Sequence, residues 1–182
     1  MLAFKPGHNL KVIKTTKNDN KYASRLKTIR RFLPLTESAK LGLETEPKIS
    51  DFNIIKQIDK GTFGKVYLVE HKETKVNFAL KIIDKLKNCS EMIYFRREIE
   101  VMYRLNHPNI VKLYGHFEDN VNVYLLLDYV RGENLYNYMK THKINNELLA
   151  RIVRQLVAAL YYLHNMKPTV VHRDINFLNP KT

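Results

Sequence analysis

Near its C-terminal end the chain carries the stretch Val170 to Asn179, which reads V-V-H-R-D-I-N-F-L-N. Two β-branched valines are typical of a strand, and the polar triplet His172-Arg173-Asp174 follows them directly. A further polar side chain, Asn179, comes five positions after Asp174. Because an ordinary surface turn after a strand also has this composition, the rest of the chain must decide between a turn and a reaction site.

Length and composition indicate a globular protein of one domain with a tail, since 182 residues include 45% hydrophobic residues. The single cysteine, Cys89, allows no intramolecular disulfide and suits a reducing compartment. The longest near-apolar run, 156–163, is too short to span a bilayer, and residues 1–20 hold no apolar core of a secretory signal. We therefore expect a cytoplasmic or nuclear protein without a membrane span.

The net charge of +13 is unevenly distributed, because residues 1–50 alone carry +7. Such a basic tail can contact nucleic acid or an anionic membrane. The tail carries no nucleic-acid-binding motif, and it is rich in Lys and Asn. We interpret residues 1–48 as a solvated, mostly disordered extension and expect no nucleic-acid partner.

From residue 51 onward, β-branched and aromatic residues predict strands at 52–60, 65–71 and 76–84, joined by short turns as an antiparallel meander. Ser90 then offers an N-cap for a helix that runs to about Leu105. Its core face is marked by apolar residues at helical spacing, namely Phe95, Ile99 and Met102.

The second half of the chain predicts strands at 110–118 and 121–129, a short helix at 133–141 and a longer helix that Asn146 caps. The longer helix carries one apolar stripe, formed by Leu149, Ile152, Val153, Leu156, Leu160 and Leu163. A five-stranded antiparallel sheet with one helix, followed by a helical region, is an α+β arrangement. The two parts join at 128–132, which we expect to be a hinge.

Lys81 lies in the middle of an apolar strand, on the same face as Ala79 and Ile83. A buried ammonium needs a counter-charge, and Glu98 lies beside the core face of the predicted helix. We therefore predict a Lys81–Glu98 ion pair. The alternatives are an edge-strand lysine and a solvated helix glutamate.

Six motifs follow one another along residues 51–179: F-G-K-V-Y, F-A-L-K, R-R-E-I-E, H-P-N-I-V-K-L-Y-G, Y-L-L-L-D-Y-V and V-V-H-R-D. Together they resemble the N-lobe and the first part of the C-lobe of a eukaryotic protein kinase. The sequence around R-R-E-I-E and H-P-N-I-V-K-L-Y-G-H-F is most similar to that of Aurora kinases, which are serine/threonine-specific. The resemblance implies an N-lobe at 49–127, a hinge at 128–132 and the start of a C-lobe at 133–182.

The resemblance also implies roles in phosphoryl transfer from ATP. Asp174 would orient the substrate hydroxyl and accept its proton, and Asn179 would bind Mg²⁺. Lys81, held by Glu98, would bind the α- and β-phosphates. The nucleotide would contact glycine-loop, strand and hinge residues, namely Ile58, Gly61, Thr62, Gly64, Val66, Ala79, Lys81, Leu127, Asp128, Tyr129, Val130 and Glu133, with Glu133 also near basic substrate residues.

The chain departs from the family pattern at two residues. Asp59 stands where the first glycine of the glycine-rich loop is expected, and Asn176 stands where a lysine usually follows the catalytic Asp. The printed sequence also stops at Thr182, before a D-F-G segment.

We therefore expect a serine/threonine kinase present as a truncated chain that is inactive by itself. A pseudokinase-like nucleotide- or protein-binding module and a basic adaptor are the alternatives. The expected partners are a protein substrate with basic residues near its acceptor and a regulatory protein that docks on the N-lobe. The Aurora resemblance implies a location at the spindle or centrosome.

Overall fold

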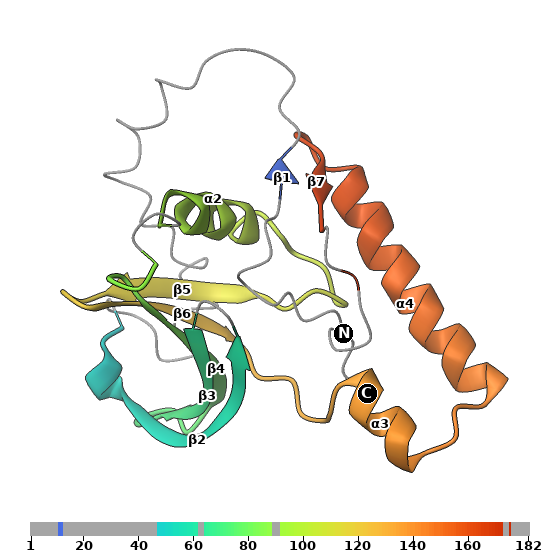
Figure 1. The fold of residues 1–182 in the computed structure, drawn as a ribbon, viewed down its shortest axis with the longest axis horizontal. Helices are drawn as coiled ribbons and strands as arrows, with labels where there is room; N and C mark the ends of the chain where they lie inside the picture. The colour runs from blue at the N-terminus through green and yellow to red at the C-terminus, as the bar shows by residue number, and fades with distance from the viewer. Residues whose placement is uncertain (1–10, 13–46, 62–63, 89–91, 173–174, 176–182) are drawn as a thin grey trace.

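The computed structural model describes residues 11–12, 47–61, 64–88, 92–172 and 175. A sheet and the helix α2 form one part of the molecule, and α3 and α4 form the other (Figure 1). The elements in chain order are β1 Lys11–Val12, the 3₁₀ helix η3 Ile49–Asp51, β2 Phe52–Gly61, β3 Gly64–His71, β4 Asn77–Asp84, α2 Met92–Met102, β5 Leu113–Glu118, β6 Asn122–Asp128, α3 Leu135–Thr141, α4 Asn146–His164 and β7 Val170–Val171.

The main sheet has five antiparallel strands in the order β2-β3-β4-β6-β5. The predicted meander of three strands and the predicted α+β class are thus confirmed. The strand β5 begins at Leu113 rather than at residue 110. The reason is a turn, in which the Ile110 N–H donates to the carbonyl of His107 at 3.0 Å.

Each face of the sheet has its own core. The face toward α2 buries aliphatic residues of β4, β5 and β6 against the helix, among them Ala79, Ile83, Leu113, Leu125 and Leu127. The opposite face buries a largely aromatic cluster that includes Phe52, Phe78 and Tyr124. Since Lys81 is two residues from both Ala79 and Ile83 along β4, its side chain projects from the same face, which is the face toward α2.

The helix α2 ends at Met102, earlier than the predicted Leu105. The next residues form a tighter turn, because Arg104 N–H donates to Val101 at 2.9 Å and Leu105 N–H donates to Met102 at 3.1 Å. Hydrogen bonds of this i to i−3 spacing are common where an α-helix ends. The proposed N-cap, Ser90, lies outside the described residues.

The predicted cap of the longest helix was wrong by one residue. The N-cap of α4 is Asn145, whose side-chain oxygen accepts the Leu148 N–H at 2.8 Å, and Asn146 is the first helical residue. Two adjacent asparagines are equally good caps in sequence, so composition alone could not choose between them.

The variant Asn145→Ala is expected to lower the free energy of unfolding by about 1 kcal/mol, because the Leu148 N–H loses its partner. Chemical denaturation followed by circular dichroism measures this loss. The neighbouring variant Asn146→Ala is the matched control and should change stability by less. Equal losses in the two variants would show that the cap contributes nothing specific.

One face of α4 packs against the end of α2 and against β7. Leu163 and Ala159, both 0% exposed, share a cluster with Val101, Leu105 and Val170. The outer part of the predicted apolar stripe remains exposed, with Leu149 at 47% and Val153 at 45%. The stripe is therefore real, and the described residues cover only its C-terminal half.

Two residues of the basic N-terminal extension form a strand beside β7, as Figure 1 shows. In this antiparallel pair Lys11 lies opposite Val171 and Val12 opposite Val170. Most of the extension that we predicted at residues 1–48 lies outside the described residues. None of the described helices combines the length and the apolar character that crossing a membrane requires.

Candidate functional site

Lys81 is the most deeply buried charged side chain that the structure describes, at 2% exposure. It lies on β4 between Val66 of β3 and Leu125 of β6, which are its direct cross-strand partners. Burial lowers the pKa of the Lys81 ammonium from 10.5 to about 7, and the carboxylates of Glu98 and then Asp59 oppose this shift. The site thus holds a cation whose charge depends on nearby anions.

Glu98 is buried on α2 at 7% exposure. It shares the buried face of the helix with Phe95, Ile99 and Met102, whereas the adjacent Arg97 is exposed. Residues three and four positions apart lie on one side of a helix, which explains why Glu98 faces the sheet. Its carboxylate is the charge that acts most strongly on Lys81.

The turn between β2 and β3 contains Gly61 and Gly64, and the residues between them lie outside the described part of the chain, Thr62 included. A Cβ atom at Gly64 would lie 2.2 Å from the carbonyl oxygen of Ile82 on β4. At Gly61 the nearest atom to such a Cβ would be at an ordinary 3.8 Å. Packing inside the sheet therefore requires Gly64, whereas it leaves room for a side chain at Gly61.

The variant Gly64→Ala should lower the free energy of unfolding by about 1–3 kcal/mol, because the added methyl group displaces the β4 backbone. Gly61→Ala is the control in the same turn and should have a clearly smaller effect. The two midpoints of thermal or urea unfolding decide this. Similar midpoints would mean that the turn can move away from β4 without cost.

The proposed nucleotide residues on the α2 face form one cluster. Ala79 lies directly opposite Leu127 on the neighbouring strand, and both are buried. Ile58, Val66 and Val130 pack against the same cluster. The structure thus brings together the predicted apolar residues of β2, β3, β4 and the hinge. It leaves Tyr129 half-buried and Glu133 exposed.

Asp128 at the start of the proposed hinge is held from both sides. One carboxylate oxygen accepts the Lys112 N–H at 2.8 Å, and the other accepts the Tyr114 hydroxyl at 2.5 Å. Its own N–H donates to the carbonyl of Lys112 at 3.0 Å. The sequence did not indicate this anchoring, because Lys112 and Tyr114 read only as strand residues. Asp128 thereby fixes the end of β6 where the chain leaves the sheet.

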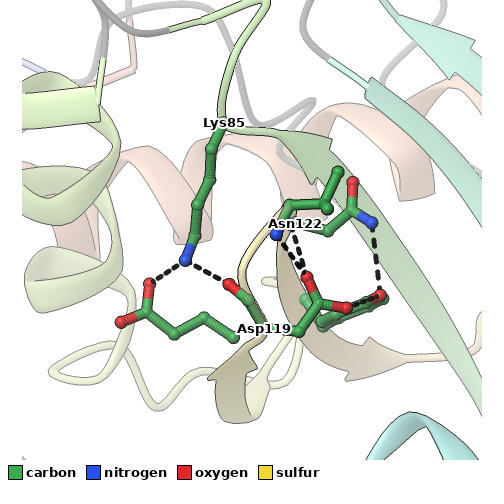
Figure 2. Close-up of polar contacts among 6 residues, drawn as sticks. Lys85, Asp119 and Asn122 are labelled. Carbon is green, nitrogen blue, oxygen red and sulfur yellow. Dashed lines mark hydrogen bonds and ion pairs between the residues drawn. The ribbon is translucent and has the colours of Figure 1, made fainter.

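The far end of the β5–β6 hairpin is anchored by a second carboxylate (Figure 2). Asp119 accepts the N–H groups of Val121 at 2.8 Å and Asn122 at 2.7 Å, and the Tyr124 hydroxyl at 2.7 Å. Lys85, just after β4, binds the Asp119 carbonyl and forms an ion pair with Glu118 at 3.0 Å. These contacts fix the hairpin register at the end away from the hinge.

Sequence reasoning also missed a contact between the turn after α2 and β5. The Tyr103 hydroxyl and His116 Nδ1 lie 2.8 Å apart in a partly buried hydrogen bond. Burial raises the pKa of Tyr103 to about 12 and lowers the pKa of His116. Both groups are therefore neutral near pH 7 and join the end of α2 to the sheet that carries Lys81.

The proposed catalytic residue Asp174 and the proposed metal ligand Asn179 lie outside the described residues. His172, which precedes them, is buried at 4% exposure. Among the residues that the structure describes, no group of three His, Cys, Asp or Glu could hold a metal ion. The arrangement of a Mg²⁺ site therefore stays a prediction.

A family model described as "Protein kinase domain" matches residues 52–179. The chain therefore belongs to the protein kinase family.

Within that family the chain is similar to Aurora kinases. It is 39% identical over 142 residues to the Aurora kinase of Saccharomyces cerevisiae, covering 76% of this chain and 38% of the yeast protein. It is 41% identical over 130 residues to Aurora kinase A-A of Xenopus laevis, covering 70% and 31%. For the Aurora kinase of Schizosaccharomyces pombe the identity is 37% over 170 residues, covering 92% and 47%. The chain spans about a third to a half of the length of these curated relatives.

Proposed function

We propose that the protein is an ATP-dependent serine/threonine kinase that transfers the γ-phosphoryl group of ATP to a protein hydroxyl. The observation that carries this proposal is the buried Lys81 on β4 facing the charge of Glu98 on α2. Burying an ammonium is costly, so a fold that merely needed stability would place an apolar residue there. A polyphosphate ligand would explain the buried charge, because its negative phosphates would bind the Lys81 ammonium.

The residues of the site divide the work of binding and chemistry. ATP would supply the phosphoryl group, and Mg²⁺ would neutralise charge on its phosphates. Lys81 would bind the α- and β-phosphates, and backbone groups of residues 128–130 would bind the adenine edge beside Ala79 and Leu127. The buried ammonium fits an anionic ligand. Asp174 would orient the substrate hydroxyl, and Asn179 would hold the metal ion.

The proposal is tested first by nucleotide affinity. Lys81→Met should weaken ATP binding by about 10- to 100-fold, because a hydrogen bond to a charged group contributes about 1.5–3 kcal/mol. Adenosine, which lacks phosphates, should bind both forms alike. Lys85→Met is the control, since this lysine pairs with Glu118 at the far end of the sheet. If Lys81→Met binds ATP as tightly as the parent chain, the nucleotide lies elsewhere.

A second function, a pseudokinase-like nucleotide- or protein-binding module, is favoured by Asp59 and Asn176, which replace a glycine and a lysine of the family pattern. Because we expect the 182-residue chain to be inactive by itself, phosphorylation of a basic peptide is measured with the chain extended by the D-F-G and activation segments of a protein kinase, as the parent and as Asp174→Asn. Turnover that vanishes in Asp174→Asn supports the kinase. ATP binding without turnover by the extended chain supports the module.

Partners and location follow the Aurora similarity. We propose a protein substrate with basic residues near its acceptor, because Glu133 is an exposed carboxylate beyond the hinge. A regulatory protein that docks on the N-lobe would find exposed apolar side chains on α2, namely Ile93 and Tyr94. The proposed boundaries are an N-lobe at 49–127, a hinge at 128–132 and a C-lobe from 133. The proposed location is the spindle or centrosome.

A further inference from the structure

Asp59 lies in one row with Lys81 across three strands. Asp59 on β2 is the direct partner of Val66 on β3, and Val66 is the direct partner of Lys81 on β4. Residues opposite one another in antiparallel strands project from the same face of the sheet. The Asp59 carboxylate therefore belongs to the α2 face, where Lys81 is buried.

The distance across this row is short enough for the charges to interact. Neighbouring strands lie about 4.8 Å apart, so two strands separate the backbones of Asp59 and Lys81 by about 10 Å, and a lysine side chain spans much of that gap. The side chain of Asp59 is held at the turn, because its Oδ1 accepts the Lys60 N–H at 2.7 Å. A register shift between Gln57 and Asp59 sets this alignment.

Lys81 therefore has carboxylates on two sides. Glu98 reaches it from α2, and Asp59 faces it from the edge strand β2, beside the glycine-bearing turn. Glu98 is buried, whereas Asp59 is exposed. An exposed carboxylate at this place faces the region where the proposed function puts phosphates, so it attracts the lysine and repels the ligand.

We propose that Asp59 is a specificity-determining residue of the nucleotide site. It makes the site select against negative charge on the ligand, so that metal-free ATP is disfavoured relative to Mg²⁺-bound ATP and to uncharged adenosine. This inference rests on the proposed nucleotide-binding function. Asp59 competes with the phosphates for Lys81, and a cation that offsets phosphate charge reduces that competition. Adenosine carries no phosphate, so its binding does not compete with Asp59 for Lys81.

The test compares Asp59→Asn with the parent chain by calorimetric titration of ATP without metal, ATP with Mg²⁺, and adenosine. Exposed charge pairs contribute about 0.2–1 kcal/mol, so Asp59→Asn should bind metal-free ATP up to about five-fold more tightly. The gain should be smaller with Mg²⁺ and absent for adenosine. The control Glu70→Gln removes the same charge from the other end of β3, where Glu70 pairs with Lys75 at 3.6 Å, and should leave all three affinities unchanged.

A second measurement reads the contact in the free protein. Titration of Lys81 by NMR, with ¹³C-labelled lysine, should show a lower Lys81 pKa in Asp59→Asn, because an attractive carboxylate has been removed. An unchanged titration, or equal gains for ATP and adenosine, overturns the inference. If neither ATP nor adenosine binds any form, the proposed function fails instead, and the Lys81 titration alone decides whether Asp59 acts on the lysine.

Discussion

Replacing Glu98 by Gln is expected to lower the free energy of unfolding by about 1.4 kcal/mol at pH 6. Lys81 is 2% exposed and Glu98 is 7% exposed, so water screens neither charge well. Removing one partner of a buried charge pair costs about 3–5 kcal/mol when the remaining group keeps its charge. At pH 6 the cost is limited to about 1.4 kcal/mol, because Lys81 has a pKa of about 7 and can release its proton. The variant keeps the shape of the side chain, and the loss therefore reports the charge.

The size of this effect depends on pH because Lys81 can release its proton. Burial gives the folded state a Lys81 pKa of about 7, against 10.5 for the ordinary group. Between these values the unfolded chain binds more protons, so the free energy of unfolding rises with pH. Glu98→Gln removes the charge that most strongly opposes the lowering of the Lys81 pKa, so the pKa of Lys81 in the folded variant falls further. In the variant Lys81 therefore loses its proton, and with it the destabilising buried charge, at lower pH than in the parent chain. The difference between parent and variant should be smaller at pH 9 than at pH 6, by up to about 1.4 kcal/mol.

Urea denaturation at pH 6 and pH 9 measures both effects. Glu100→Gln, two residues along α2 and not among the charges that act on Lys81, is the control and should change stability by less than about 0.5 kcal/mol. The double variant Lys81→Met with Glu98→Gln should regain most of the loss, since no charge is then left unpaired. A pH-independent loss, or a double variant as unstable as the single one, would contradict the ionic explanation.

Strand and helix order could be read from the sequence because periodicity reports burial. Alternation along β4 predicted that Ala79, Lys81 and Ile83 share a face, and two of them line the α2 core. Ends of elements were less predictable. Leu105 continues the helical spacing of α2, but the helix ends at Met102 because the following turn tightens. Local hydrogen bonding decides such ends, and hydrophobic spacing does not describe it.

Long-range polar contacts were outside the reach of sequence pattern. The hydrogen bond from the Tyr114 hydroxyl to Asp128 joins residues fourteen apart in the sequence, and Tyr114 lies at a register shift in β5. A bulge of this kind changes which face later side chains occupy, and nothing in the residue types announces it. The same holds for Asp59, which read as a lost glycine until the β2–β3 register aligned it with Lys81. The sequence could therefore indicate which charged and polar residues matter, whereas their interaction partners could be identified only from the three-dimensional structure.

The second large effect is expected at Leu163, where α4 meets α2 and β7. Leu163 is 0% exposed and shares its cluster with Val101 of α2 and Val170 of β7. Leu163→Ala should lower the free energy of unfolding by about 2–5 kcal/mol, because it removes buried methyl groups and leaves a cavity that rigid helices fill poorly. Val170 and Val171 lead directly to His172, so loosening this cluster should also loosen the strand before the proposed catalytic residues.

Leu149→Ala provides the matched control on the same helix, because Leu149 is 47% exposed in the structure. Its loss should be under about 1 kcal/mol, since little buried area disappears. Hydrogen exchange locates the damage: Leu163→Ala should speed exchange at the N–H groups of β7 and the end of α2 more than in β3 and β4, whose core is separate. Equal losses for the two leucines, or uniform exchange across the sheet, would mean that α4 does not hold β7 through this cluster.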